Sequence, residues 1–194
     1  GAAQQLWLVE PSPLSALPWD GSGVPLNPQI TSTAKGELLG PWQTLERRSY
    51  GLAASNQPPA WQQQPPARSD LDFAAGGNPQ LEALAEDWRQ QLAPAQRLAA
   101  AQALFQGQPF RYTLQPPPLG EVAPLDRFLF GSRAGFCEHF ASAFTALMRA
   151  AGVPARVVVG YQGGNWIPAN PWGRGYLEVL QQDAHAWSEV WLAD

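Results

Sequence analysis

The chain has 194 residues, a formal net charge of −4 and a hydrophobic content of 45%, with 14% charged residues. This balance is typical of a folded globular protein and excludes an intrinsically disordered chain. The acidic balance argues against nucleic acid as a partner, since nucleic-acid binding needs basic patches. The single cysteine excludes an intramolecular disulfide, and no apolar run is long enough to span a bilayer.

Residues 1–70 are predicted to form a proline-rich, irregular segment that contains short β-strands. Half of the 20 prolines lie here, and proline excludes long helices and central strands. Short strands are expected in "QQLWLVE" and "QTLERRSYGL". We therefore place a boundary at residue 70 and predict a second domain over residues 71–194.

Two helices are predicted at the start of the second domain. In "GGNPQLEALAEDWRQQL", Asn78 stands at the N-cap position and Pro79 at the first helical position. Apolar residues then recur at helical spacing through Leu92. Pro94 begins the second helix, which is expected to run through Phe105 and end before Gly107.

The next segments are predicted to be short, until a longer helix begins at the cysteine. "FRYTLQPPPLG" is expected to be extended, and "APLDRFLF" favours a short amphipathic helix. Cys137 opens a helix of roughly 14 residues that Gly152 and Pro154 end. A thiol at a helix N-terminus lies at the positive end of the helix dipole, which favours a thiolate and can bind an oxyanion. An isolated cysteine is nevertheless more often a buried core residue.

The histidines decide between these two interpretations of Cys137. His139 lies two residues away on the same helix and faces another side, so it is expected to be structural or to face the substrate. His185 lies in "DAHAWSEVWL", where alternation places His185, Trp187, Glu189 and Trp191 on one strand face. "ARVVVGY" and "YLEVLQQ" are strand-like. The Gly/Pro/Trp-rich segment between them, "YQGGNWIPANPWGRGY", is expected to be a loop. This loop either lines a substrate cleft or only connects the strands. A helix packed on this sheet can bring thiol and imidazole together.

"GFCEHFASAFTALMRAAGVPARVVVGYQGG" and "DAHAWSEVWL", in this order, resemble the nucleophile helix and histidine strand of the transglutaminase-like cysteine enzymes. "FRYTLQPPPLG" and "LDRFLFGSRAGFCEH" look like the bacterial membrane-anchored branch of that family. The resemblance covers about residues 80–194 and implies an α+β, papain-like core in which a nucleophile helix packs on an antiparallel sheet. It also implies a core that is incomplete at its C-terminus.

When the family's residue roles are transferred by position, the resemblance implies that Cys137 is the nucleophile and His185 the general base. The family's orienting Asp is expected about 15 residues beyond His185, past the end of this chain, so Asp194 is not assigned that role. The backbone N–H of Cys137 is one expected oxyanion donor, and Tyr112 or one of nine tryptophans is the second. Glu138 and Glu189 are expected to be structural. No metal-ligand spacing or phosphate-binding glycine loop is present, so no cofactor is expected.

Three functions stay open from the sequence. The leading hypothesis is transglutaminase-type acyl transfer, in which Cys137 attacks a glutamine carboxamide or peptide carbonyl and an amine resolves the thioester. The second is a cysteine peptidase or amidase that uses water with the same Cys–His pair. The third is a non-catalytic extracytoplasmic binding module. The expected partners are a protein or peptide acyl donor and a primary amine, and the family branch implies a periplasmic domain whose membrane tether lies outside these residues.

Overall fold

The computed structural model describes residues 4–10, 15–19, 21, 23–33, 35–41, 46–55 and 65–192. The chain divides into two compact units, residues 1–65 and residues 66–194. Among the described residues, no helix combines the length and the apolar character needed to cross a bilayer.

The first unit is built from short antiparallel strands. One sheet has the order β1–β6–β3, and the other has the order β2–β5–β4. The strands are β1 (Gln4–Val9), β2 (Ala16–Leu17), β3 (Val24–Pro25), β4 (Thr31–Ser32), β5 (Leu38–Leu39) and β6 (Arg48–Ala53). Four buried residues form its small core: Ile30, Leu38, Tyr50 and Leu52. The strands predicted in "QQLWLVE" and "QTLERRSYGL" are present as β1 and β6, although the start of the second segment lies outside the described residues.

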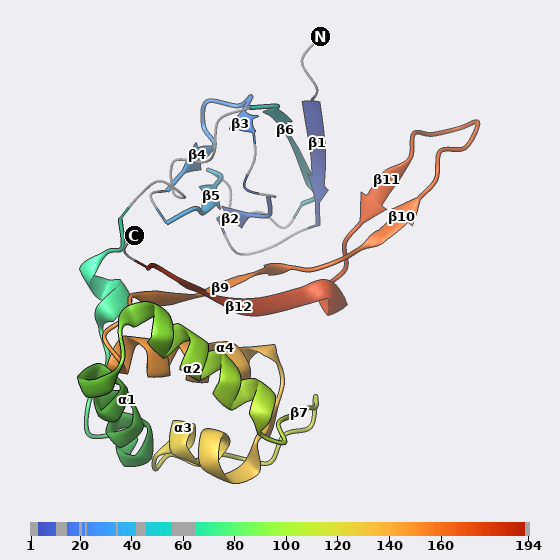
Figure 1. Ribbon diagram of the computed structural model, residues 1–194. Coiled ribbons are helices and arrows are strands. Elements are labelled where there is room, and N and C mark those ends of the chain that lie inside the picture. The colour runs from blue at the N-terminus through green and yellow to red at the C-terminus, as the bar shows by residue number, and fades with distance from the viewer. Residues whose placement is uncertain are drawn as a thin grey trace. The chain divides into compact units, whose positions relative to one another are not determined.

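The second unit is organised around one helix and one pair of strands. Its helices are α1 (Pro79–Gln91), α2 (Pro94–Gly107), α3 (Pro124–Asp126) and α4 (Cys137–Ala150), with 3-10 turns at Arg68–Leu71 and Gln181–Asp183. A π-helical segment, Arg127–Ser132, continues α3. The strands are β7 (Arg111–Tyr112), β8 (Ala134–Gly135), β9 (Ala155–Tyr161), β10 (Asn165–Ile167), β11 (Tyr176–Glu178) and β12 (Ala184–Val190). Figure 1 shows α4 lying along β9 and β12, with both of which it makes contacts.

The core of this unit is apolar and centres on α4. Leu147 and Met148 of α4 are fully buried, and they join Leu81 of α1 and Phe128 of the π-helical segment. The predicted apolar face of α1 is confirmed, because its buried residues are Leu81, Ala85 and Trp88. Burying such side chains contributes about 1.5–3 kcal/mol each, so this cluster holds the helix that begins with Cys137.

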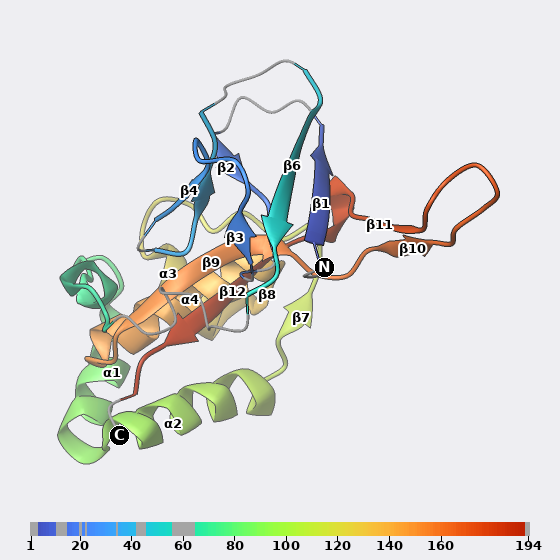
Figure 2. The ribbon, with the colours of Figure 1, turned by 90° about the horizontal axis from the view of Figure 1, so that it is seen from above.

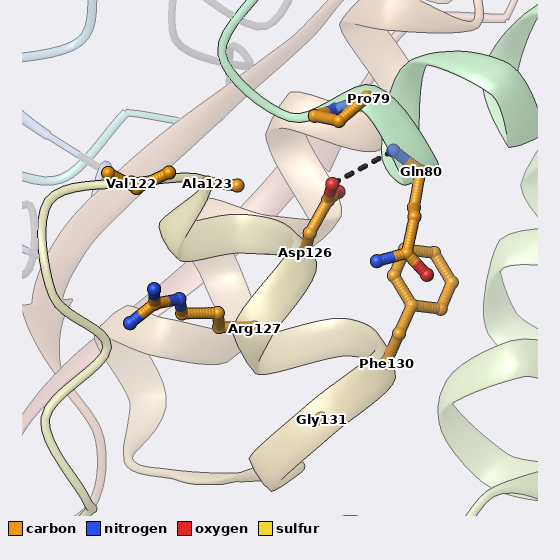
Figure 3. A pocket seen from close by; sticks show the side chains of 8 residues that line it. All are labelled: Pro79, Gln80, Val122, Ala123, Asp126, Arg127, Phe130 and Gly131. Carbon is orange, nitrogen blue, oxygen red and sulfur yellow. Dashed lines mark hydrogen bonds between the residues drawn. The ribbon is translucent and has the colours of Figure 1, made fainter.

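The N-termini of α1 and α3 cap each other (Figure 3). The Asp126 carboxylate is buried and accepts hydrogen bonds from the backbone N–H groups of Gln80 and Leu81, both at 2.8 Å. Asn78 stands before α1, but its side chain accepts from the N–H groups of Leu125 (2.9 Å) and Asp126 (3.3 Å) instead. Asn78 thus holds the predicted N-cap position, but its side chain makes no capping bond to its own helix. The competing acceptor comes from a residue 48 positions away, which local sequence patterns do not reveal.

The strands β9 and β12 form an antiparallel pair in which His185 lies opposite Gly160. The predicted alternation along β12 is confirmed: Glu189 binds Arg156 on one face, while Ser188 contacts α4 on the other. The segment predicted as a loop contains an additional strand, β10, which pairs with β11. Figure 2 shows this hairpin extending beyond the end of the β9–β12 pair. β11 lies in the predicted strand "YLEVLQQ", whereas β10 was hidden by glycines and prolines, which normally indicate turns.

The helix α4 begins and ends at the predicted residues, and its start is tightly built. A Cβ atom on Gly135 would lie 2.6 Å from Cβ of His139, so only glycine fits there. The Nδ1 atom of His139 accepts a hydrogen bond from the backbone N–H of Phe136 at 3.4 Å, and its ring packs edge-on against the Phe136 ring. At the other end, Gly152 has a φ of +73°, which ends the helix.

Candidate active site

One cavity of about 580 Å³ contains all three residues to which the sequence assigned chemistry. Cys137, His185 and Tyr112 line it together with residues from α2, β7, α4 and β12. The remaining lining residues are Gln102, Phe105, Phe110, Phe140, Ala141, Phe144, Ala186, Trp187 and Ser188. Side chains that are up to 86 residues apart in the sequence thus meet in one space.

Cys137 enters the cavity from the first residue of α4. Its thiol is free and half-buried. The first N–H groups of a helix have no carbonyl partner within that helix, and they point toward the N-terminal end. A developing oxyanion next to Cys137 would therefore meet the positive end of a 14-residue helix.

His185 enters from the start of β12, and its ring lies on the same side of the strand as that of Trp187. The ring lies nearly parallel to Trp187, with 6.5 Å between the ring centres. Trp187 donates from Nε1 to Glu189 at 3.3 Å, and Glu189 forms an ion pair with Arg156 at 2.7 Å. Within the described residues, the imidazole nitrogens of His185 have no hydrogen-bond partner, Cys137 included.

Tyr112 reaches the cavity because of the parallel pairing of β7 with β8. Tyr112 lies beside Gly135, two residues before Cys137, and the N–H of Thr113 donates to the Gly135 carbonyl at 2.8 Å. The Tyr112 ring stacks on Phe140 with 6.4 Å between centres and is 61% exposed. The phenol is consequently supported from one side and open to solvent on the other.

The other acidic and histidine residues near this site have structural contacts or lie away from it. His139 accepts from the Phe136 backbone, Glu138 is exposed, and Glu189 pairs with Arg156. None of the three lines the cavity. Asp194 lies outside the described residues.

Sequence reasoning missed the aromatic wall of the cavity. Phe105, Phe110, Phe140 and Phe144 pack against one another with ring centres 4.9–6.1 Å apart. A signal was present, because Phe140 and Phe144 follow Cys137 at three and seven residues and so share its side of the helix. Their partners, Phe105 of α2 and Phe110 just before β7, gave no comparable signal.

A second cavity, of about 370 Å³, lies where α1 meets α3 and its π-helical continuation (Figure 3). The carboxylate of Asp126 already occupies the N–H groups of α1 there. We therefore interpret this cavity as part of the structural junction. In the part of the chain that the structure describes, no three His, Cys, Asp or Glu side chains gather to hold a metal ion.

Comparison with known proteins agrees with this architecture. The family model described as "Transglutaminase-like superfamily" matches residues 82–194, more than half of the chain. The chain belongs to the transglutaminase-like superfamily. This confirms the predicted resemblance and the predicted α+β, papain-like fold class.

Two similar bacterial proteins carry curated descriptions. A protein-glutamine gamma-glutamyltransferase from Pseudomonas aeruginosa is 50% identical over 123 residues, which cover 63% of this transglutaminase-like chain and 18% of the relative. An uncharacterized protein, YebA, from Bacillus subtilis is 40% identical over 77 residues, covering 40% of this chain and 10% of that protein. The chain thus spans only a small part of both relatives.

A solved structure is similar over nearly the whole chain. It is the periplasmic domain of TgpA from Pseudomonas aeruginosa, with a TM-score of 0.82 and 36% sequence identity. The match covers 97% of this chain and 65% of that domain. About a third of the TgpA domain has no counterpart in these 194 residues.

Proposed function

We propose that this protein performs transglutaminase-type acyl transfer, with Cys137 as the nucleophile and His185 as the general base. The observation that supports the proposal is the shared cavity, which places a helix-start thiol and an imidazole on one substrate-sized space. The membership of the superfamily gives the same reaction class.

The proposed reaction has two halves. Sγ of Cys137 gives its proton to His185 and attacks the carboxamide carbon of a glutamine side chain. The Cys137 N–H and the Tyr112 hydroxyl donate to the oxyanion that forms. When the C–N bond breaks, the leaving nitrogen takes the proton from His185, so ammonia departs and a thioester remains.

The second half decides the product. A primary amine that gives its proton to His185 attacks the thioester, forms a new amide and releases the thiol. Water in the same position gives a carboxylate, which is hydrolysis. The open side of the cavity at Tyr112 gives either acceptor a route to the thioester.

Two further elements of the proposal come from the family. A carboxylate beyond residue 194 would hold the His185 ring, which has no hydrogen-bond partner within the described residues. The acyl donor would be a protein or peptide outside the cytoplasm, with the membrane tether outside these residues.

The experiment supplies a glutamine-containing protein and a fluorescent primary amine, and it follows amine uptake and ammonia release together. Wild type is compared with Cys137→Ala and Cys137→Ser, using this chain and a longer form that continues past residue 194. Amine uptake that needs Cys137 supports transamidation, and ammonia release without uptake identifies a hydrolase. If neither form releases ammonia or takes up amine, acyl transfer is contradicted, and a binding module is favoured.

A further inference from the structure

Two hydroxyl groups, of buried Thr145 and half-buried Ser188, join the cysteine helix to the histidine strand. The Thr145 hydroxyl on α4 donates to Oγ of Ser188 on β12 at 2.9 Å. Ser188 in turn donates to the backbone carbonyl oxygen of Ala141, also at 2.9 Å. Thr145 is only 4% exposed, so water competes little for these bonds.

This hydroxyl chain lies further along both elements than the two proposed reacting groups. Ala141 is one helical turn after Cys137, and Thr145 is one turn further along the same side of α4. Ser188 is three residues after His185 on β12. A slip of β12 by a single residue would move His185 by about 3.3 Å relative to α4 and would break both bonds.

The other contacts of α4 with the strands define the position of β12 along α4 less sharply. The face of β12 toward α4 otherwise presents Ala186 and Val190, and apolar burial has no preferred direction. Arg149 donates from Nε to the Ala155 carbonyl at 2.7 Å, but this bond lies at the far end of α4 and reaches β9. Among the described residues, the Thr145–Ser188–Ala141 chain makes the only side-chain hydrogen bonds between α4 and β12.

We infer that Thr145 and Ser188 are positioning residues that set the distance between the Cys137 thiol and the His185 imidazole. The inference rests on the proposed function, because it assumes that these two groups react as a pair. It goes beyond that function by assigning their alignment to a hydroxyl chain whose hydrogen bonds involve neither Cys137 nor His185.

Thr145 allows a matched pair of variants. Thr145→Val keeps the branched shape and removes the hydroxyl, whereas Thr145→Ser keeps the hydroxyl and removes a methyl group. The readout is the rate of Cys137 alkylation by iodoacetamide as a function of pH, together with the melting temperature. Each variant is also made with His185→Ala. Asp126→Asn serves as a control that weakens the fold at the start of α1, away from the Thr145–Ser188–Ala141 hydrogen bonds.

The expected result is a specific loss near pH 6.5, roughly the ordinary pKa of histidine. Thr145→Val is expected to lower the alkylation rate about tenfold, since small misplacements of reacting groups have effects of this order. Thr145→Ser should keep most of the rate, and Thr145→Val should cause no further loss when His185 is already alanine. Asp126→Asn should lower the melting temperature and leave the pH profile unchanged.

Two results would overturn the inference, and they are distinguishable. If wild type reacts through His185 and Thr145→Val reacts equally well, the hydroxyl chain does not position the pair and the proposed function stands. If wild-type reactivity is independent of His185, no pair exists to be positioned, and the proposed function fails as well.

Discussion

At the scale of single residues, Gly135 determines how closely the chain can turn into the cysteine helix. A Cβ atom there would lie 2.6 Å from Cβ of His139 and 3.0 Å from the ring of Phe128. The Cβ atom of His139 is bonded directly to the backbone, and the Phe128 ring is buried, so neither can move aside. The backbone at Gly135 would therefore have to shift. That movement would displace the first turn of α4, which carries Cys137.

Gly135→Ala is therefore expected to lower the free energy of unfolding by about 1–3 kcal/mol, the usual cost of overpacking. Urea unfolding measures this difference. Gly131→Ala is the matched control, because a Cβ atom there meets nothing within 4 Å. Equal effects at both positions would contradict the close-packing argument.

Glu82 is a carboxylate in the first turn of α1, and backbone N–H groups just before that helix make it more acidic. Backbone hydrogen bonds from Gly76, at 2.8 and 3.0 Å to its two oxygens, and from Asn78 at 3.0 Å hold the pKa of Glu82 below its ordinary value of 4.5. A lowered folded-state pKa adds stability above 4.5, and that stability is lost as the pH falls through the folded-state value.

The Glu82→Gln variant should accordingly melt below wild type at pH 7, and the gap should close in acid. Thermal unfolding followed from pH 7 down through pH 4.5 into acid tests this, since the stabilisation by the ionised carboxylate is lost as Glu82 becomes protonated in the folded state. A gap that stays constant across this range would show that the charge of Glu82 contributes nothing.

At the scale of elements, α1 and α3 are joined by an exchange of caps. Asp126 accepts from two N–H groups of α1, and Asn78 accepts from two N–H groups at the start of α3. Both side chains are more than nine-tenths buried. Loss of one acceptor leaves buried N–H groups unpaired, which costs more than a surface hydrogen bond.

Asp126→Asn should thus lower the free energy of unfolding by about 2 kcal/mol, because one of its two acceptor oxygens becomes an N–H₂ donor that faces another donor. Guanidinium unfolding measures the effect. Glu121→Gln changes a neighbouring exposed carboxylate and should lie within about 0.5 kcal/mol of wild type. Similar losses for the two variants would contradict the exchange of caps.

At the scale of the whole molecule, the two elements that hold Cys137 and His185 were predictable because they have strong local signals. Glycine and proline bracket α4, and period-two alternation marks β12. Placing Tyr112 near Cys137 was harder, since it depends on the pairing of β7 with β8 across 23 residues. The pairing of Cys137 with His185 was expected from the resemblance to a family, whereas the residue pattern alone left it open.

The features that escaped prediction are those that arise between elements. The strand β10 lies among glycines and prolines, where strands are disfavoured, and only its pairing with the predicted strand β11 reveals it. The cap exchange joins residues 48 positions apart, and the Thr145–Ser188 bond joins residues 43 positions apart. Single hydrogen bonds of this range have no periodicity, so a sequence offers nothing from which to infer them.

The central claim is that Cys137 and His185 act as one nucleophile–base pair. The most direct measurement is the rate of Cys137 alkylation by iodoacetamide across pH, read by intact mass, for wild type and His185→Ala. The account predicts that wild type reacts well below roughly pH 8.5, the ordinary pKa of a free thiol, and that His185→Ala removes this reactivity. Identical profiles for the two proteins would contradict the claim.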